Sequence, residues 1–240
     1  MDSKSIAKLN EALRPLDLPQ RIALIAKSFP DLVFTTSFGT EDQLITWAII
    51  DGGINLSGKL GHVKSFDIPT KYIGPLSRFT PSNTVIKNNL MVLLSGPEPQ
   101  RTLLEEKLLS ELKNYPGKVV FLKGIIEKKQ TIESTGNMTI YNFMTTDLLE
   151  KTINESALII SRSGYTTIMD LAKLNKKAFF IPTPGQFEQE YLAERLTEMC
   201  LVPSCKQDDF TLKKLKDVSS YEGLKSFDFE VSYNDLFSLF

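Results

Sequence analysis

The sequence predicts an α/β fold: a Rossmann-like parallel sheet with helices on both faces, preceded by a short, mostly helical N-terminal fragment. Two observations support this prediction. Four strand-to-helix units follow one another after residue 89, and right-handed crossovers between such units give a parallel sheet. The first of these strands, 90–96, is a continuous apolar run, as expected for a strand that is buried on both faces.

The first 53 residues have a different pattern. Residues 3–14 and 20–28 carry helical apolar spacing, 31–39 indicate a strand that runs into a glycine turn, and 41–50 resume as a helix. The segment that follows is rich in glycine turns and proline and has little periodicity, which favours a boundary near Gly53. We therefore expect an N-terminal fragment of residues 1–53 and a larger domain of residues 54–240.

The larger domain alternates strands and helices. Its first helix, 101–117, has an apolar stripe of leucines at 104, 108 and 112, and Pro116 and Gly117 end it. A polar loop follows the next strand. The remaining strands are expected at 118–124, 138–144, 157–164 and 176–185, and the remaining helices at 147–156, 166–175 and 188–199.

The composition is that of an ordinary folded protein, with 42% hydrophobic and 24% charged residues. The net charge of -1 encodes no overall attraction to nucleic acid or to an anionic membrane. No apolar run approaches the ~18 residues of a membrane span, and the N-terminus has no signal-peptide pattern, so we expect a cytoplasmic location. Peripheral contact with a membrane stays compatible with the sequence. Cys200 and Cys205 lack the partners of a zinc site, and neither a metal nor a cofactor is expected.

One strand-to-helix loop has the features of a phosphate site, because ligands of open parallel sheets bind beyond the carboxyl ends of the strands. Ser163 and Gly164 end the strand 157–164, and Gly164 lets a ligand approach the backbone. Thr166 opens a helix whose free amides attract an anion, and Asp170, one turn later on the same face, could accept hydrogen bonds from a ribose. The alternative is that Thr166 is only an N-cap and Asp170 an acid that complements the helix dipole.

A second loop, SGPEPQR at 95–101, is also a candidate. Ser95 and Gly96 are expected phosphate contacts and Arg101 a counter-charge, whereas Glu98 would repel an anion unless it points away. A third loop, at 182–191, offers Gly185, Gln186 and Gln189. The alternative for this third loop is a plain turn that precedes a solvated helix start.

Together these loops resemble a known family. ALIISRSGYTTIMDLAKLNKKAFFIPTPGQFEQEYLAERL, with YIGPLSRF, VLLSGPEPQR and TIYNFM upstream, is similar to the C-terminal donor-binding domain of GT-B glycosyltransferases related to the peptidoglycan UDP-N-acetylglucosamine transferase, of the family 28 type. The similarity covers residues 54–240. It implies one C-terminal half of a GT-B enzyme, which binds a UDP-sugar and stabilises the leaving diphosphate without a metal ion.

The resemblance also implies roles for single residues. Asp170, where the family usually has glutamate, would bind the ribose, and Gln189 would contact the sugar. Arg78 and Ser95 would approach the diphosphate or the sugar, and Met144 would contact the uracil through its backbone. The other expected substrate-binding residues are Gly96, Ser163, Gly164, Thr166 and Gly185. The loop at 95–101 departs from the family in lacking the second glycine and the serine of the common GGS loop.

Residues 1–50 resemble the start of phosphoadenylylsulfate (PAPS) reductases. TTSFGTEDQ is similar to the pyrophosphate-binding loop of that family, in which Ser37, Phe38 and Gly39 would hold phosphate. The likeness ends near Ile50, and the nucleophilic cysteine of the reductases has no counterpart here. Reduction of a sulfonucleotide is therefore not expected. His62, the only histidine, is expected to be a solvated loop residue rather than a catalytic base.

No counterpart of the acceptor-binding N-terminal domain of these transferases is recognisable, so the catalytic residue is unknown. We expect a donor-binding domain that transfers a hexosyl group only with an acceptor-binding partner subunit or in a homo-oligomer. The alternative is a non-catalytic nucleotide-binding or interaction module, and a sulfonucleotide reductase fragment is a third, disfavoured reading.

Overall fold

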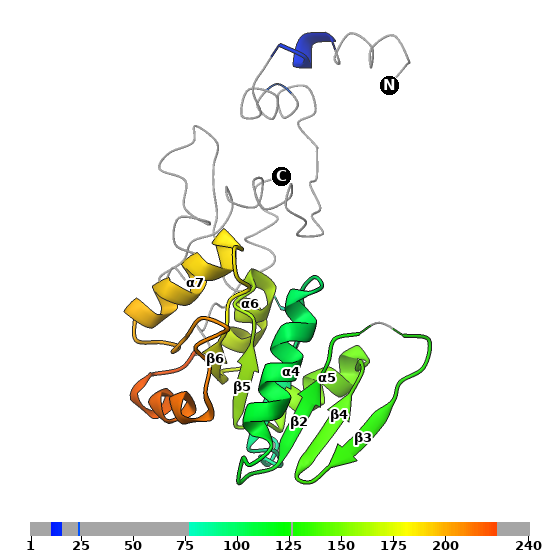
Figure 1. The fold of residues 1–240 in the computed structure, drawn as a ribbon. Coiled ribbons are helices and arrows are strands. Elements are labelled where there is room, and N and C mark those ends of the chain that lie inside the picture. Colours follow the sequence, from blue (N-terminus) through cyan, green and yellow to red (C-terminus); the bar gives the residue numbers. More distant parts are fainter. Residues whose placement is uncertain (1–10, 16–23, 25–76, 126, 225–240) are drawn as a thin grey trace.

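The structure is a computed structural model that describes residues 11–15, 24, 77–125 and 127–224 (Figure 1). Within the first of these ranges a short helical stretch lies at 11–13. The other elements expected before residue 53, the boundary near Gly53, and His62 lie outside the described residues.

A six-stranded sheet forms the centre of the described domain. Its strands are β1 (Leu90–Leu93), β2 (Val119–Leu122), β3 (Ile132–Thr135), β4 (Met138–Tyr141), β5 (Leu158–Ser161) and β6 (Lys177–Phe180). The strands lie in the order β3-β4-β2-β1-β5-β6, and every neighbouring pair is parallel except β3 and β4. The predicted parallel α/β sheet is therefore confirmed.

The edge strand β3 was not expected, because residues 124–138 have the composition of a polar loop. In the structure β3 pairs antiparallel with β4, and all four of its residues are exposed. The two strands are joined through Gly136, whose φ of 60° suits a tight turn. A strand exposed on both faces needs no apolar alternation, which is why the sequence carries no signal for it.

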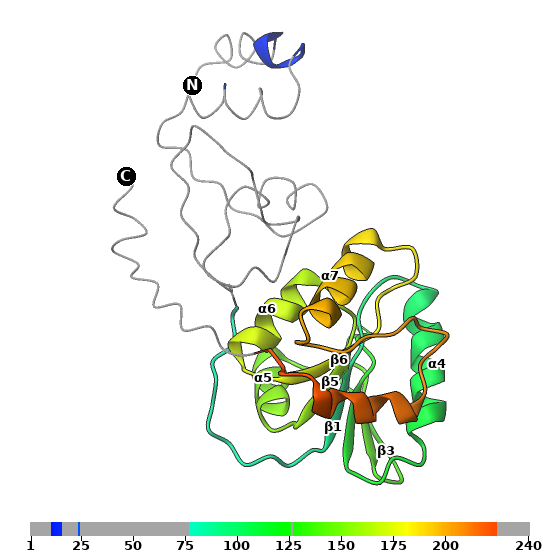
Figure 2. The same ribbon diagram turned by 90° about the vertical axis from the view of Figure 1, so that its left-hand side faces the viewer.

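Helices cover both faces of the sheet, as Figure 2 shows. One face carries α4 (Gln100–Leu112) and the 3-10 helix η2 (Leu212–Ser220), and one apolar cluster joins them to the sheet through Leu104, Leu108, Leu112 and Val218. The opposite face carries α5 (Thr146–Asn154), α6 (Tyr165–Lys173) and α7 (Phe187–Glu198). The helix η2 was not predicted. Helix α4 uses the leucine stripe that the sequence indicates.

The register of the sheet places three loops side by side. Ser161 of β5 is the partner of Leu93 in β1 and of Phe180 in β6. Because the three strands are parallel, the loops that follow β1, β5 and β6 leave the same edge of the sheet. The three loops singled out in the sequence therefore meet. No helix in the described ranges is long and apolar enough to cross a membrane.

Candidate functional site

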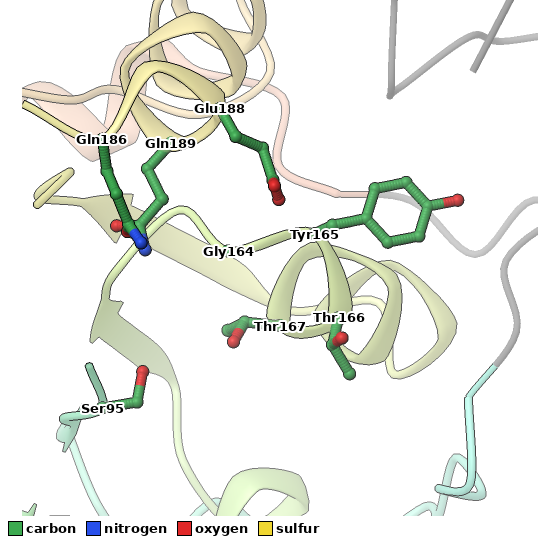
Figure 3. Close-up of a pocket in the computed structure, with 8 residues that line it drawn as sticks. All are labelled: Ser95, Gly164, Tyr165, Thr166, Thr167, Gln186, Glu188 and Gln189. Atoms are coloured by element: carbon green, nitrogen blue, oxygen red, sulfur yellow. The ribbon is translucent and has the colours of Figure 1, made fainter. Parts of the chain in front are cut away.

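A pocket of about 280 Å³ lies where these three loops meet. Ser95 comes from the loop after β1, Gly164 precedes α6, and Gln189 lies in α7. Figure 3 shows the hydroxyl groups of Ser95 and of the first turn of α6 on one side, and the side-chain carboxamides of Gln186 and Gln189 on the other. The lining residues are Ser95, Gly164, Tyr165, Thr166, Thr167, Gln186, Glu188 and Gln189.

The floor of the pocket is the open N-terminus of α6. Gly164 is its N-cap residue, in extended backbone (φ -69°, ψ 143°), and no side chain caps the first turn. The idea that Thr166 is the N-cap is wrong, since Thr166 is the second helical residue. A Cβ built on Gly164 would meet nothing nearer than Thr167 Oγ1 at 4.0 Å, so there is open space beside Gly164 itself. Such a helix start presents unpaired N–H groups to a ligand.

Hydrogen bonds join the loops after β5 and β6 to α7. The Ser163 hydroxyl donates to the backbone oxygen of Gln189 (2.7 Å), and Gln189 Oε1 accepts from the backbone N–H of Thr183 (2.9 Å). Gly185, with a φ of 78°, donates its N–H to Glu190 Oε1 (2.9 Å). Ser163 and Gly185 thus shape the loops and do not line the pocket. Because its Oε1 holds the third loop at Thr183, Gln189 is more than a solvated helix residue, and its Nε2 donor has no protein partner among the described residues.

In the loop after β1, Ser95 lines the pocket but Arg101 does not. Arg101 is buried and pairs with Glu98 and Glu105, at 2.6 Å in both ion pairs. The expectation that Arg101 is a counter-charge for a ligand is therefore wrong. Glu98 points back to its own helix, where its Oε2 accepts from the N–H of Thr102 (3.1 Å).

Gly96 stands beside Ser95 and has a φ of 107°, a conformation that a side chain would strain. A Cβ at this position would lie 3.8 Å from Thr183 Oγ1, so Gly96 brings the first loop close to the third. Thr183 Oγ1 is buried and has no hydrogen-bond partner in the part of the chain that the structure describes. Gly96 thus lies beside Thr183 and does not line the pocket.

Asp170 lies on α6, one turn beyond Thr166, outside the pocket lining. It is half-buried, and its Oδ1 accepts a hydrogen bond of 2.6 Å from the Ser77 hydroxyl. Burial raises the pKa of the Asp170 carboxyl, while the Ser77 hydrogen bond and the charge of Arg78 act to lower this pKa. Asp170 lies beyond the first turn of α6, so it is not the acid that compensates the amides at the helix start.

Two expected ligand residues lie outside the pocket. Arg78 is exposed, close enough to Asp170 to act on its pKa, and its guanidinium lies 5.1 Å from the centre of the Phe79 ring. Met144 follows β4, which is separated from β1 by β2, and it packs against the core on the α6 side of the sheet. Both could be reached only by a ligand that extends beyond the pocket.

Tyr165 and Glu188 line the pocket but were not among the expected site residues. Burial, helped by the charge of Glu188, raises the pKa of the Tyr165 hydroxyl to about 12, so the phenol stays neutral near pH 7. In Figure 3 the Tyr165 ring points away from the other labelled side chains, and the Glu188 carboxylate lies above the start of α6. Tyr165 follows Gly164 and Glu188 precedes Gln189, so these expected site residues could have indicated that their neighbours line the pocket. In the sequence, however, Glu188 has the pattern of an ordinary acid in the first turn of a helix.

The pocket therefore combines free amides with four hydroxyl-bearing side chains and two carboxamides, and the Glu188 carboxylate also lines it. This set of groups suits an anion at the helix start and a polyhydroxylated group beside it. The described residues contain no cluster of three or more His, Cys, Asp or Glu side chains that could share a metal ion.

The chain is similar to known proteins over its C-terminal part. The sequence profile of the glycosyltransferase family 28 C-terminal domain matches residues 100–222, a little over half of the 240 residues. No curated protein sequence matches.

Among solved structures, SnogD from Streptomyces nogalater has a TM-score of 0.42 at 13% identity, over 63% of this chain and 40% of SnogD. ALG13 in solution has a TM-score of 0.42 at 19% identity, over 64% of this chain and 94% of ALG13. MurG from Acinetobacter baumannii has a TM-score of 0.45 at 20% identity, over 66% of this chain and 51% of MurG. None of these TM-scores reaches 0.5.

The match to the family profile begins at the first residue of α4 and ends just beyond η2, so it includes the loops after β5 and β6 and most of the pocket. The chain therefore belongs to the glycosyltransferase family 28 C-terminal domain family.

Proposed function

We propose that this domain binds a UDP-sugar, with the diphosphate on the first turn of α6. The observation that carries the proposal is the helix start at Gly164, which no side chain caps and which opens into the pocket. Backbone N–H groups and the helix dipole both favour a negatively charged group there.

The other parts of the donor follow from this placement. Asp170, one turn along α6, accepts from the ribose hydroxyls with the oxygen that Ser77 does not use. The Nε2 of Gln189 donates to the sugar from the opposite wall. The uracil extends toward Met144, and Arg78 approaches the donor from the segment that precedes β1.

The reaction needs an acceptor that this domain does not hold. An acceptor hydroxyl oxygen forms a bond to the anomeric carbon of the sugar, the bond from that carbon to the diphosphate oxygen breaks, and UDP leaves. The hydroxyl proton passes to a base on the acceptor-binding side. We propose that this side is a separate domain or partner subunit, because the matched family is that of a C-terminal domain. A homo-oligomer is the second arrangement that could supply it.

Two further expectations stay predictions. The first is the domain boundary near residue 53, together with the resemblance of residues 1–50 to PAPS reductases, which neither the family match nor the described residues support. The second is the cytoplasmic location.

Isothermal titration calorimetry with UDP, UDP-N-acetylglucosamine, ADP and adenosine 3',5'-bisphosphate tests the proposal. We expect UDP to bind at least tenfold more tightly than ADP. A matched pair of variants, Thr166→Val in the pocket and Thr152→Val on α5 outside the pocket, checks the location, and only the first should weaken UDP binding. If no nucleotide diphosphate binds, the remaining hypothesis is a non-catalytic interaction module. If adenosine 3',5'-bisphosphate binds most tightly, the result would favour a sulfonucleotide reductase fragment.

A further inference from the structure

Arg162, immediately after β5, is the largest fully buried side chain of the described domain, with 1% of its surface exposed. Burying a guanidinium is costly, and proteins usually offset the cost with a carboxylate. Here none is present. Among the described residues Arg162 forms no ion pair, and all of its hydrogen-bond partners are neutral.

The guanidinium joins the segments that form the pocket. Its Nη1 donates to the backbone oxygens of Ile181 (3.1 Å) and Pro182 (3.0 Å), in the loop after β6. Its Nη2 donates to the backbone oxygen of Gln100 (2.8 Å), at the start of α4, and to Gln207 Oε1 (2.7 Å). One side chain thus connects the loops after β1, β5 and β6.

The hydrogen bonds leave the charge itself without compensation. Within the described part of the chain, Nε of Arg162 has no partner, and neither does the buried Thr183 Oγ1 in the adjoining loop. Burial lowers the pKa of Arg162 to about 10, so the side chain remains a cation near pH 7. Arg162 precedes the N-cap residue Gly164 by two positions. A buried cation acts across a medium of low effective dielectric constant, where its attraction for an anion is stronger than in water.

We propose that Arg162 is a positioning residue for the donor diphosphate: it holds the three loops together and supplies a buried positive charge that the bound diphosphate neutralises. The inference rests on the proposed function. Arg162 does not line the pocket, so it acts through the field of its charge and through the loops rather than by direct contact.

The Gln207→Glu variant distinguishes the effect of the Arg162 charge from the role of Arg162 in holding the three loops together. The substitution puts a carboxylate 2.7 Å from the guanidinium, in the place of the present acceptor, and leaves Arg162 and its backbone hydrogen bonds intact. Gln100, which now pairs with the Gln207 amide at 3.0 Å, can turn its own amide to donate instead. Thr211→Glu is the matched control, because Thr211 is exposed and the change adds the same charge to the same segment.

The readout is the ratio of the uridine and UDP dissociation constants, which a purely structural role would not change. We expect Gln207→Glu to lower this ratio about tenfold with no loss of melting temperature, and Thr211→Glu to leave it within twofold of wild type. An unchanged ratio in Gln207→Glu would overturn the proposal.

Arg162→Lys and Arg162→Met form a second pair, in which lysine keeps the charge and methionine removes it at similar length. The ratio should be about tenfold lower in the methionine variant than in the lysine variant, and equal ratios would overturn the proposal. If wild-type protein binds no UDP, the proposed function fails and this inference fails with it. If wild type binds UDP but both comparisons show no difference, only the role of Arg162 is refuted.

Discussion

The starts of α4 and α6 form an instructive pair. Both helices follow a parallel strand through a glycine-containing loop, and both loops have the sequence features of a phosphate site. At α4 the protein supplies its own anion, because Glu98 accepts from the N–H of Thr102 and pairs with Arg101. At α6 no side chain caps the first turn, and Gly164 opens onto the pocket. We therefore expect a helix start to bind a ligand only where no side chain of the protein already occupies it.

Substituting Gly164 by aspartate should give α6 the arrangement of α4 and have the largest effect. The extended backbone of Gly164 suits an aspartate N-cap, and there is room for the Cβ, so the variant should be more stable by about 0.5–1 kcal/mol. Its carboxylate would occupy the amides and repel the diphosphate, so UDP affinity should fall by about a hundredfold or more. Calorimetry and thermal denaturation measure the two effects.

Gly164→Ser is the control for this change. Serine can cap the helix without a charge, and its loss of UDP affinity should be at least tenfold smaller than that of the aspartate variant. Equal UDP binding by wild type and Gly164→Asp would mean that the diphosphate lies elsewhere.

Asp170→Asn should have the next largest effect. Asparagine keeps an acceptor for Ser77 but loses the negative charge that the ribose hydroxyls would meet, so we expect UDP binding to weaken about tenfold. Because the acid lies beyond the first turn of α6, the effect should be the same for UDP and uridine. A loss confined to UDP would instead assign Asp170 to the diphosphate part of the site.

The same variant should change stability in a pH-dependent way. Burial raises the pKa of Asp170 in the folded state, so its ionised form costs stability above that pKa, and the cost disappears as the pH falls through it. Asp170→Asn should therefore melt at a higher temperature than wild type near pH 7, and the two should converge toward about pH 4. A difference that grows as the pH falls would contradict this sign.

Glu98→Gln should have the smallest effect. It removes the anion from the start of α4 and leaves α6 untouched, so UDP affinity should stay within twofold of wild type, with a slightly lower melting temperature. Binding of a second UDP to this variant would show that Glu98 alone keeps the first loop closed to ligands.

Much of the fold could be predicted because its strands are buried on both faces. The runs LMVL, VVFL and LIIS are nearly or fully buried, and such continuous apolar runs between helices indicate a parallel sheet. The strand β3 and the helix η2 escaped prediction because β3 is wholly exposed and η2 buries only Val218.

The candidate site could be predicted only as far as local patterns extend. The sequence pattern of a strand, then Gly164, then a helix predicts an open helix start. Contacts between residues far apart in sequence carry no such signal: Ser77 and Asp170 are 93 positions apart, and Arg162 meets Gln207 across 45. The pairing of Arg101 with Glu98 and Glu105 lies within one helical turn on either side, so its spacing could have corrected the expected role of Arg101.

The most direct test of the central claim is a titration of the protein with UDP, followed by the amide proton and nitrogen chemical shifts. The amides of Tyr165, Thr166 and Thr167 should shift most, and by clearly more with UDP than with uridine, while those of Arg101, Thr102 and Leu103 change little. Larger shifts at the start of α4, or none at the start of α6, would contradict the claim that the uncapped helix holds the diphosphate.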